Sequence, residues 1–212
     1  MGTLTLLGKG GFGVSYRYTP SVTTNNTTGV SDFVIKGFFE QDMDNPKSSR
    51  QRETNMRKLD HANIIKYFDE HIHVDGCGYD IIEFGGESVQ KRYLKKGEMP
   101  ELEIKKAMVS VASGLEYLHM ATGPGYIVHR DIRSDNITVN SEGVYKIIDF
   151  GISSRTTAEN SRFASNKNWG HPFWKSPEFC RYMKTVWSRE CSPGNVNCDP
   201  LFISMLSRLL YL

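Results

Sequence analysis

The sequence predicts an α+β protein made of two lobes, with strands in the first lobe and helix in the second. Segments of strand character dominate the early part of the chain. A glycine pair, Gly85-Gly86, then marks a change of character, and the longest helical pattern begins later, near Glu101. We therefore expect the lobes to meet near residue 84, with residues 1–83 and 84–212 as the two parts.

Several segments of the first lobe have strand character. Residues 3–18 alternate around a glycine cluster, and residues 33–39 form an apolar run around Lys36. An Asn- and Thr-rich stretch, residues 19–32, separates them and is typical of an exposed hairpin loop. The other expected elements of this lobe are a polar helix at 47–58 and strands at 64–69 and 79–84.

The clearest helix of the chain opens the second lobe at Pro100, since proline suits the first helical turn. Its apolar residues recur at spacings of four, three, four and three, which predicts a helix buried along one face. These residues are Ile104, Met108, Val111, Leu115 and Leu118. Two short strands are expected at 137–139 and 144–148, and the polar stretch 151–168 is loop-like.

Composition excludes several classes of protein. The 212 residues, 39% of them hydrophobic, can form a buried core, which excludes wholesale disorder. The net charge of +2, from 26 basic and 24 acidic residues, predicts no general attraction to nucleic acid or membranes. Apolar runs are short and interrupted, so no membrane-spanning helix is expected. With four cysteines, no CxxC pair and no visible export signal, we expect reduced thiols and a cytoplasmic location.

The first segment that indicates chemistry is the run G-K-G-G-F-G-V at residues 8–14. Glycines let backbone N–H groups approach a polyphosphate, although the same pattern serves dinucleotide-binding folds and plain hairpin turns. A dinucleotide site needs a helix directly after the glycines, whereas residues 14–18 alternate like a strand. Lys36 lies either on a solvated face or below the glycine loop, where it would neutralise phosphate. In the second case a carboxylate must hold it, and Glu53 is the candidate.

The densest polar run between apolar strands is H-R-D-I-R-S-D-N at residues 129–136, and D-F-G follows at 149–151. Asn136 and Asp149 can supply oxygen ligands to Mg²⁺, which leaves Asp131 free to orient a hydroxyl nucleophile. Each motif alone has a simpler interpretation as a turn or a cap. Their joint occurrence in this order argues against that interpretation.

Further motifs accompany these two. They are V-I-K at 34–36, L-D-H-A-N-I at 59–64, I-E-F at 82–84, G-H-P-F-W at 170–174 and S-P-E at 176–178. With them, residues 3–178 resemble a eukaryotic-type protein kinase domain, and the catalytic loop is similar to that of the Ste group of Ser/Thr kinases. The resemblance implies a bilobal protein-kinase-like fold with an antiparallel-sheet first lobe. It also implies a mainly helical, incomplete second lobe, because the family's later helices have no counterpart after Glu178.

The resemblance implies an ATP-dependent protein Ser/Thr kinase, with ATP and Mg²⁺ as cofactors and a protein hydroxyl as acceptor. Lys36, held by Glu53, would contact the α- and β-phosphates. Asp149 and Asn136 would hold Mg²⁺, and Asp131 would orient the hydroxyl and accept its proton. The implied catalytic residues are Asp131, Lys36, Arg133 and Glu53.

The adenine would lie between the two lobes, against the hinge that follows the gatekeeper residue Ile82. The floor of its pocket would be Thr138. The implied ATP-binding residues are Gly8, Lys9, Gly10, Gly11, Phe12, Gly13, Val14, Val34, Lys36, Ile82, Glu83, Phe84, Gly85 and Thr138.

The arginine before the catalytic aspartate, Arg130, is similar to that of kinases whose activation loop is ordered by a phosphate. Ser161 and Ser165 are the nearest candidate acceptors. An ordinary serine-rich loop is the alternative interpretation of this stretch.

Three positions depart from the family pattern. Arg133 and His171 stand where Ser/Thr kinases usually carry Lys and Thr. Glu53 lies eight residues before His61, one fewer than usual, and the usual count would select Arg52; we favour Glu53 because an arginine cannot pair with a lysine. With the incomplete second lobe, these departures leave an alternative function open: a pseudokinase-like nucleotide-binding docking module, or an inactive kinase fragment.

Overall fold

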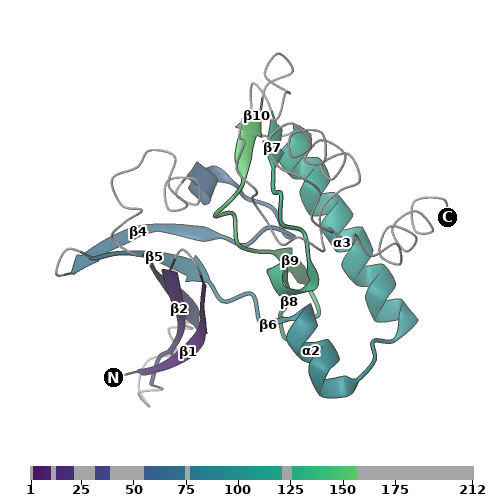
Figure 1. Ribbon diagram of the computed structural model, residues 1–212, viewed down its shortest axis with the longest axis horizontal. Coiled ribbons are helices and arrows are strands. Elements are labelled where there is room, and N and C mark those ends of the chain that lie inside the picture. The colour runs from purple at the N-terminus through teal and green to yellow at the C-terminus, as the bar shows by residue number, and fades with distance from the viewer. Residues whose placement is uncertain are drawn as a thin grey trace, which may run out of the picture.

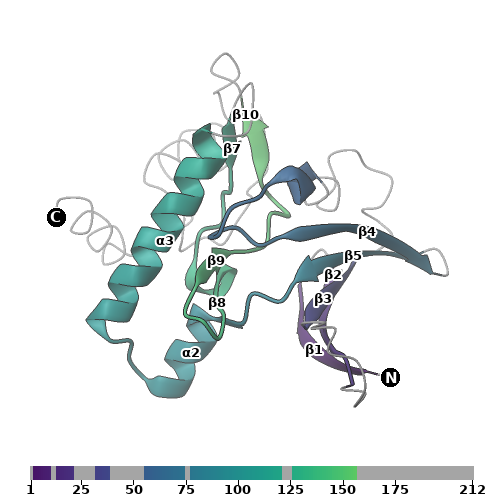
Figure 2. The same cartoon turned by 180° about the vertical axis from the view of Figure 1, so that it is seen from behind.

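The computed structural model describes residues 2–10, 13–21, 32–38, 55–74, 77–120 and 126–156, with only the backbone given for 69–74, 77 and 154–156. A twisted antiparallel sheet comes first and two helices follow on the other side of the molecule (Figure 1). The reverse view in Figure 2 shows the same separation. The predicted α+β arrangement is confirmed.

The first sheet has five strands in the order β1-β2-β3-β5-β4, and every neighbouring pair is antiparallel. The strands are β1 (Thr3–Lys9), β2 (Gly13–Thr19), β3 (Phe33–Phe38), β4 (Tyr67–Val74) and β5 (Cys77–Glu83). The strand predictions at 3–18, 33–39 and 79–84 are confirmed. Of the expected helix at 47–58, the described part is a short 3₁₀ helix, η2 (Asn55–Lys58).

The strand expected at 64–69 is wrong at its start. Ile64 forms a parallel bridge with Ile147, and the Ile65 N–H donates to the Ile147 carbonyl at 3.0 Å. The Ile147 N–H donates in turn to the Asn63 carbonyl at 2.9 Å. These backbone groups are therefore used to join the first sheet to the second lobe, and β4 begins only at Tyr67.

The second lobe contains two helices, one 3₁₀ turn and five short strands among the described residues. They are β6 (Glu87–Ser88), α2 (Val89–Lys96), α3 (Glu101–Met120), β7 (Tyr126–Val128), η3 (Ser134–Asn136), β8 (Ile137–Val139), β9 (Tyr145–Ile147) and β10 (Ser154–Thr156). Strands β6, β8 and β9 form one antiparallel sheet, and β10 pairs with β7. The expectation of loop over 151–168 is wrong at β10, because β7 supplies a hydrogen-bonding partner there.

Helix α2 was not predicted from the sequence, although both of its ends are capped. The Ser88 hydroxyl accepts the N–H of Lys91 at 3.2 Å, as an N-cap residue does. Gly97 ends the helix with a φ of 78°, and its N–H donates to the Tyr93 carbonyl at 2.7 Å. The helix has only eight residues and none of them is buried, so its apolar residues Val89, Tyr93 and Leu94 form too short a pattern to predict a helix.

Helix α3 is confirmed, but its buried face differs from the predicted one. Val111 and Leu118 are buried, whereas Ile104 and Met108 are 39% and 37% exposed. The buried residues of the helix are Ala107, Val111, Gly114 and Leu118. A Cβ atom at Gly114 would lie 3.0 Å from Ile147 Cδ1, so small residues let this face approach β9 closely.

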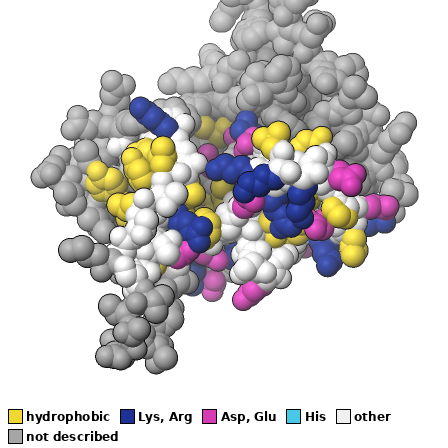
Figure 3. Space-filling view, turned by 90° about the horizontal axis from the view of Figure 1, so that it is seen from below, with side chains coloured by type: hydrophobic (Ala, Val, Ile, Leu, Met, Phe, Trp, Pro, Cys, Tyr) yellow, Lys and Arg dark blue, Asp and Glu magenta, His cyan; other side chains and the backbone are white. Residues whose placement is uncertain are grey.

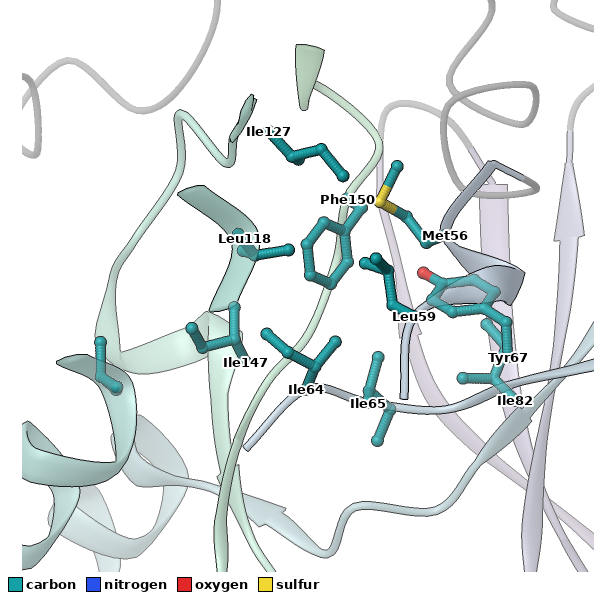
Figure 4. Close-up of a cluster of buried hydrophobic side chains, with 11 residues drawn as sticks. Met56, Leu59, Ile64, Ile65, Tyr67, Ile82, Leu118, Ile127, Ile147 and Phe150 are labelled. Atoms are coloured by element: carbon teal, nitrogen blue, oxygen red, sulfur yellow. The ribbon is translucent and has the colours of Figure 1, made fainter. Parts of the chain in front are cut away.

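One hydrophobic core joins the two lobes (Figure 4). It takes side chains from η2, β4, β5, α3, β7 and β9, and Phe150 lies in its middle with no exposed surface. Its buried members are Met56, Leu59, Ile64, Ile65, Tyr67, Ile82, Val111, Leu118, Ile127, Ile147 and Phe150. Burying a large apolar side chain contributes about 1.5–3 kcal/mol, so this cluster holds the sheet against the helices.

The surface carries charges of both signs. Figure 3 shows a group of Lys and Arg side chains over the α2 end of the molecule, with acidic side chains among them. Lys95 pairs with Glu87 at 2.6 Å and Arg92 with Glu103 at 3.3 Å. In the part of the chain that the structure describes, neither helix combines the length and apolar character needed to cross a membrane.

Replacement of Leu118 by Ala tests the position of the core. Leu118 has no exposed surface, so Leu118→Ala is expected to lower the free energy of unfolding by about 2–5 kcal/mol. Leu102 on the same helix is 64% exposed, and Leu102→Ala is expected to change that value by less than about 0.5 kcal/mol. Urea denaturation measures both, and equal losses would contradict the assigned core.

Candidate active site

The residues of the two polar motifs meet at one end of a β-hairpin. Strands β8 and β9 are antiparallel, with Ile137 opposite Ile147. The residues just before β8 and just after β9 are therefore neighbours, and the Ile148 N–H donates to the Asn136 carbonyl at 2.9 Å. This register brings Asn136 beside the start of the D-F-G segment.

Asp131 is fixed by two neighbours from its own loop. The side-chain amide of Asn136 donates to the Asp131 carbonyl at 2.9 Å and to its carboxylate Oδ2 at 2.8 Å. The Asp131 N–H donates to His129 Nδ1 at 3.3 Å. Because the Asn136 nitrogen is used in these bonds, its amide oxygen faces a different direction and remains an oxygen donor for a cation.

His129 is the buried support of this loop. Its Nε2–H donates to the Ile148 carbonyl at 2.9 Å, and its ring lies edge-on to Phe150 with centroids 4.8 Å apart. Burial lowers the pKa of His129, and the Ile148 carbonyl and the carboxylates of Asp149 and Asp131 oppose this only in part. A neutral imidazole is also what the hydrogen bonds require, since one ring nitrogen donates and the other accepts.

Asp149 connects the D-F-G segment to the first sheet. Its Oδ1 lies 3.1 Å from Lys36 Nζ and accepts the Gly151 N–H at 3.4 Å. The Lys36 ammonium is the main reason why the pKa of Asp149 is lowered, so the group is a carboxylate at neutral pH. Asp149 has a φ of 63°, an uncommon value for a residue with a side chain. Its side chain is 46% exposed, so the carboxylate remains accessible to a ligand while it is paired.

Arg133 forms an ion pair within its own loop. Its guanidinium pairs with Asp135 Oδ2 at 2.6 Å, within the η3 turn. Its Nε atom is buried without a hydrogen-bond partner among the described residues. The preceding Arg130 has a φ of 72°, so the chain bends sharply just before Asp131.

The predicted hinge is tied to both lobes by Glu83. Its carboxylate accepts the Lys66 N–H at 3.1 Å and pairs with Lys146 Nζ at 3.0 Å. Thr138 is buried and lies beside the hinge. A Cβ atom placed on Gly85 would lie 2.5 Å from the Thr138 hydroxyl. A residue larger than glycine does not fit at this hinge position without movement of its neighbours.

The other predicted adenine-site residues lie on the strands that lead to the hinge. Ile82 is buried in the main core, and Val34 packs against it from the opposite strand position. Val14 faces Gly37 across β2 and β3. Gly8 and Lys9 end β1, and Gly10 donates its N–H to the Gly13 carbonyl at 2.9 Å.

Some predicted residues lie outside the described part of the chain. They are Gly11, Phe12, Arg52, Glu53, Ser161, Ser165 and His171. The expected pairing of Lys36 with Glu53 therefore stays a prediction, as do the phosphorylation candidates.

Two features of this region were missed at the sequence level. The guanidinium of Arg17 lies 4.1 Å from the ring centroid of Phe84 at the hinge and pairs with Asp32. Asp80, inside β5, has no exposed surface and pairs with Arg57 of η2 at 2.9 Å. A lone aspartate in an apolar strand was the available signal for the second pair.

The donor set fits Mg²⁺ in its chemistry. Among the described residues, no group of three or more His, Cys, Asp or Glu side chains could hold a metal ion. Mg²⁺ is nevertheless bound in many phosphate sites by one or two protein oxygens, and substrate phosphates and water complete its shell. The Asp149 carboxylate and the Asn136 amide oxygen are hard oxygen donors of that kind.

Comparison with known proteins decides the family. The family described as protein kinase domain matches residues 2–191. The chain belongs to the protein kinase family. This match confirms the predicted bilobal kinase-like fold, and the described five-stranded sheet and the helices α2 and α3 agree with it.

Curated relatives have similar sequences over most of this kinase domain. Cytokinesis protein sepH of Aspergillus terreus is 32% identical over 195 residues, which cover 88% of this chain and 13% of that protein. Mitogen-activated protein kinase kinase kinase 5 of Arabidopsis thaliana is 29% identical over 196 residues, covering 89% of this chain and 25% of the relative. Serine/threonine-protein kinase BCK1/SLK1/SSP31 of Saccharomyces cerevisiae is 30% identical over 199 residues, covering 88% and 13%.

These names agree with the resemblance to Ser/Thr kinases of the Ste group, which is confirmed. The chain spans only 13–25% of the length of these three relatives. The similarity therefore concerns the kinase domain and not the rest of those proteins.

The lowered pKa of His129 predicts a specific pH dependence of stability. The unfolded histidine binds a proton near its ordinary pKa of 6.5, whereas the buried one resists protonation to lower pH. The contribution of the buried His129 to stability is therefore fully present above its ordinary pKa of 6.5 and is lost as the pH decreases toward the lowered pKa. The loss is about 1.4 kcal/mol for each unit by which the pKa is lowered.

His129→Gln removes this titration and keeps a side-chain donor for the Ile148 carbonyl. Urea denaturation at about pH 7.5 and about pH 5 measures the loss in both proteins. The wild-type protein is expected to lose more stability between these pH values than the variant. An equal loss in the two proteins means that His129 does not contribute to the pH dependence.

Proposed function

We propose that this chain is a protein Ser/Thr kinase domain that transfers the γ-phosphate of ATP to a protein hydroxyl. One observation carries the proposal: the Lys36–Asp149 pair and the Asn136–Asp131 pair lie at adjoining ends of the same β-hairpin. A cation, a metal-ligating carboxylate and a second oriented carboxylate are the groups that phosphoryl transfer needs in one place.

Lys36 is the proposed contact to the α- and β-phosphates. Its ammonium is a compact charge on a flexible stem, and Asp149 keeps it near the place where phosphates would bind. The glycines of residues 8–13 would add backbone N–H groups above the phosphates. Glu53 remains the proposed second carboxylate partner of Lys36.

Asp149 and Asn136 are the proposed Mg²⁺ ligands. The lowered pKa of Asp149 keeps its carboxylate charged, as a cation ligand must be. Asn136 is buried and anchored through its nitrogen, which fixes the direction of its oxygen. Mg²⁺ in this position would neutralise charge on the phosphate oxygens.

Asp131 is the proposed base. Its backbone and one carboxylate oxygen are held by Asn136 and His129, so it would orient an incoming hydroxyl and accept its proton as the oxygen attacks phosphorus. Arg133 is a proposed electrostatic helper, although its pairing with Asp135 gives it less freedom to reach the transferred phosphate.

The adenine is proposed to lie against the hinge, between the strand residues Val14 and Val34 and the floor residue Thr138. The ion pairs of Glu83 with Lys146 and of Arg17 with Asp32 would keep the hinge backbone in position for hydrogen bonds to the base. Ile82 would limit the depth of the pocket. The remaining proposed ATP contacts come from Phe84, Gly85 and the glycine loop.

Preference for Ser and Thr is supported by the names of the relatives, one of which is a serine/threonine-protein kinase. We also propose a cytoplasmic location and activation through phosphorylation of Ser161 or Ser165, with Arg130 as the phosphate partner. The competing function, a nucleotide-binding docking module, is supported by Arg133, whose guanidinium is paired with Asp135.

Replacement of Asp131 by Asn tests the proposed function. Loss of the base is expected to reduce transfer of labelled γ-phosphate to a mixed Ser/Thr peptide library at least about a hundredfold. ATP affinity, measured by calorimetry, should change by less than about twofold, because Asp131 does not contact the phosphates.

The matched control is Asp60→Asn, since Asp60 is 86% exposed and lies outside the site. It should retain both transfer and binding. A wild-type chain that binds ATP but transfers no phosphate would favour the docking module. Equal transfer by Asp131→Asn and wild type would overturn the assignment of the base.

A further inference from the structure

A buried carboxylate lies opposite the proposed phosphate lysine. In the pairing of β3 with β5, Lys36 and Asp80 are direct cross-strand partners. Such partners in an antiparallel sheet project to the same face, with Cβ atoms about 4.5–5.5 Å apart. The flexible Lys36 side chain is therefore within reach of two carboxylates, Asp80 in the sheet and Asp149 in the D-F-G segment.

A cationic side chain other than Lys36 pairs with Asp80. The guanidinium of Arg57, on η2, lies 2.9 Å from Asp80 Oδ1. The Asp80 side chain has no exposed surface and that of Arg57 is 17% exposed, so solvent screens this pair weakly. Lys36 Nζ, by contrast, lies 3.1 Å from Asp149.

We infer that Arg57 is a positioning residue for the kinase reaction: by pairing with Asp80, it leaves the Lys36 ammonium directed toward Asp149 and the phosphates. The inference rests on the proposed function only in assigning the phosphate contact to Lys36. Its physical basis is competition between two carboxylates for one ammonium. A buried carboxylate that loses a cationic partner attracts the next available cation strongly, because the low dielectric of the interior strengthens the interaction.

Arg57 also belongs to a segment that contributes to the core, and an experiment must separate this structural contribution from an effect on Lys36. Its neighbours Met56 and Leu59 belong to the core around Phe150, so disturbance of η2 could loosen the site without any change at Lys36. Two measurements distinguish these effects. One needs no nucleotide, and the other compares two nucleotide-site ligands that differ in their phosphates.

The first measurement is a double-mutant cycle on stability without nucleotide, using Arg57→Met and Lys36→Met. When Arg57→Met is made in the wild-type protein, Lys36 can take the place of Arg57 beside Asp80. In the Lys36→Met protein no lysine is present to do so. Arg57→Met is thus expected to destabilise the Lys36→Met protein more than the wild-type protein. Equal losses in both backgrounds would overturn the inference.

The second measurement compares the affinities for Mg-ATP and for adenosine, which lacks phosphates. Arg57→Met is expected to weaken ATP binding about tenfold or more, as for a lost charge-assisted contact, and to leave adenosine binding within about twofold. The double variant Arg57→Met/Asp80→Asn removes the competing carboxylate and is expected to recover ATP binding. Equal weakening of both ligands, or no recovery, would mean that Arg57 is only structural.

Control variants keep the result decisive. Arg92 pairs with Glu103 and is away from the site, so Arg92→Met should keep the preference for ATP over adenosine and show no coupling to Lys36. If Arg57→Met does not fold, Arg57→Gln removes the charge but keeps a donor for Asp80, and the same outcomes apply. Failure of the wild-type chain to bind ATP would overturn the proposed function, while the nucleotide-free cycle would still decide the role of Arg57.

Discussion

Burial of one aromatic ring, that of Phe150, determines the geometry of the site. The ring lies in the core that joins the first sheet to the helices, with His129 edge-on against it. Since the ring points inward, the preceding residue must project the other way, and Asp149 does so with a φ of 63°. Its carboxylate thereby reaches Lys36 on the sheet. The apolar core thus compensates for the strained backbone of Asp149, and this backbone conformation places the carboxylate in its ion pair with Lys36.

The site depends equally on how the two lobes are joined. The Ile65 N–H donates to the Ile147 carbonyl and the Ile147 N–H donates to the Asn63 carbonyl, and these two bonds connect the chain before β4 directly to β9. The same strand β9 carries the D-F-G segment at its end, so the chain that leads into the first sheet is joined directly to the strand that positions Asp149. Backbone pairing therefore fixes the distances between the charged side chains of the site. These charges interact more strongly than in water, because the dielectric of their surroundings is lower.

The sequence predicted most strands of the first sheet, β8, β9, helix α3 and the polar motifs, because those depend on local periodicity and spacing. It did not predict α2, which has only eight residues and buries none of them, although Ser88 and Gly97 are ordinary cap residues. The buried face of α3 was misjudged because Gly114, which an apolar pattern does not count, lets the helix approach β9 closely. A lone aspartate in an apolar strand marked Asp80, but its pairing with Arg57 arises from tertiary packing and could not be read from the sequence. The places of Asp131 and Asn136 followed from motif spacing, but the hydrogen bonds between them depend on the three-dimensional arrangement of the loop.

If these residues form a nucleotide site in a folded kinase domain, Mg-ATP must stabilise the folded chain. Thermal unfolding of the 212-residue chain with and without millimolar Mg-ATP tests it most directly. A ligand that binds only the folded state stabilises it by about 2.7 kcal/mol at about 100 times its dissociation constant. We expect a cooperative transition whose midpoint rises with Mg-ATP and does not rise with Mg²⁺ in the absence of nucleotide. A cooperative transition that Mg-ATP leaves unchanged would contradict it.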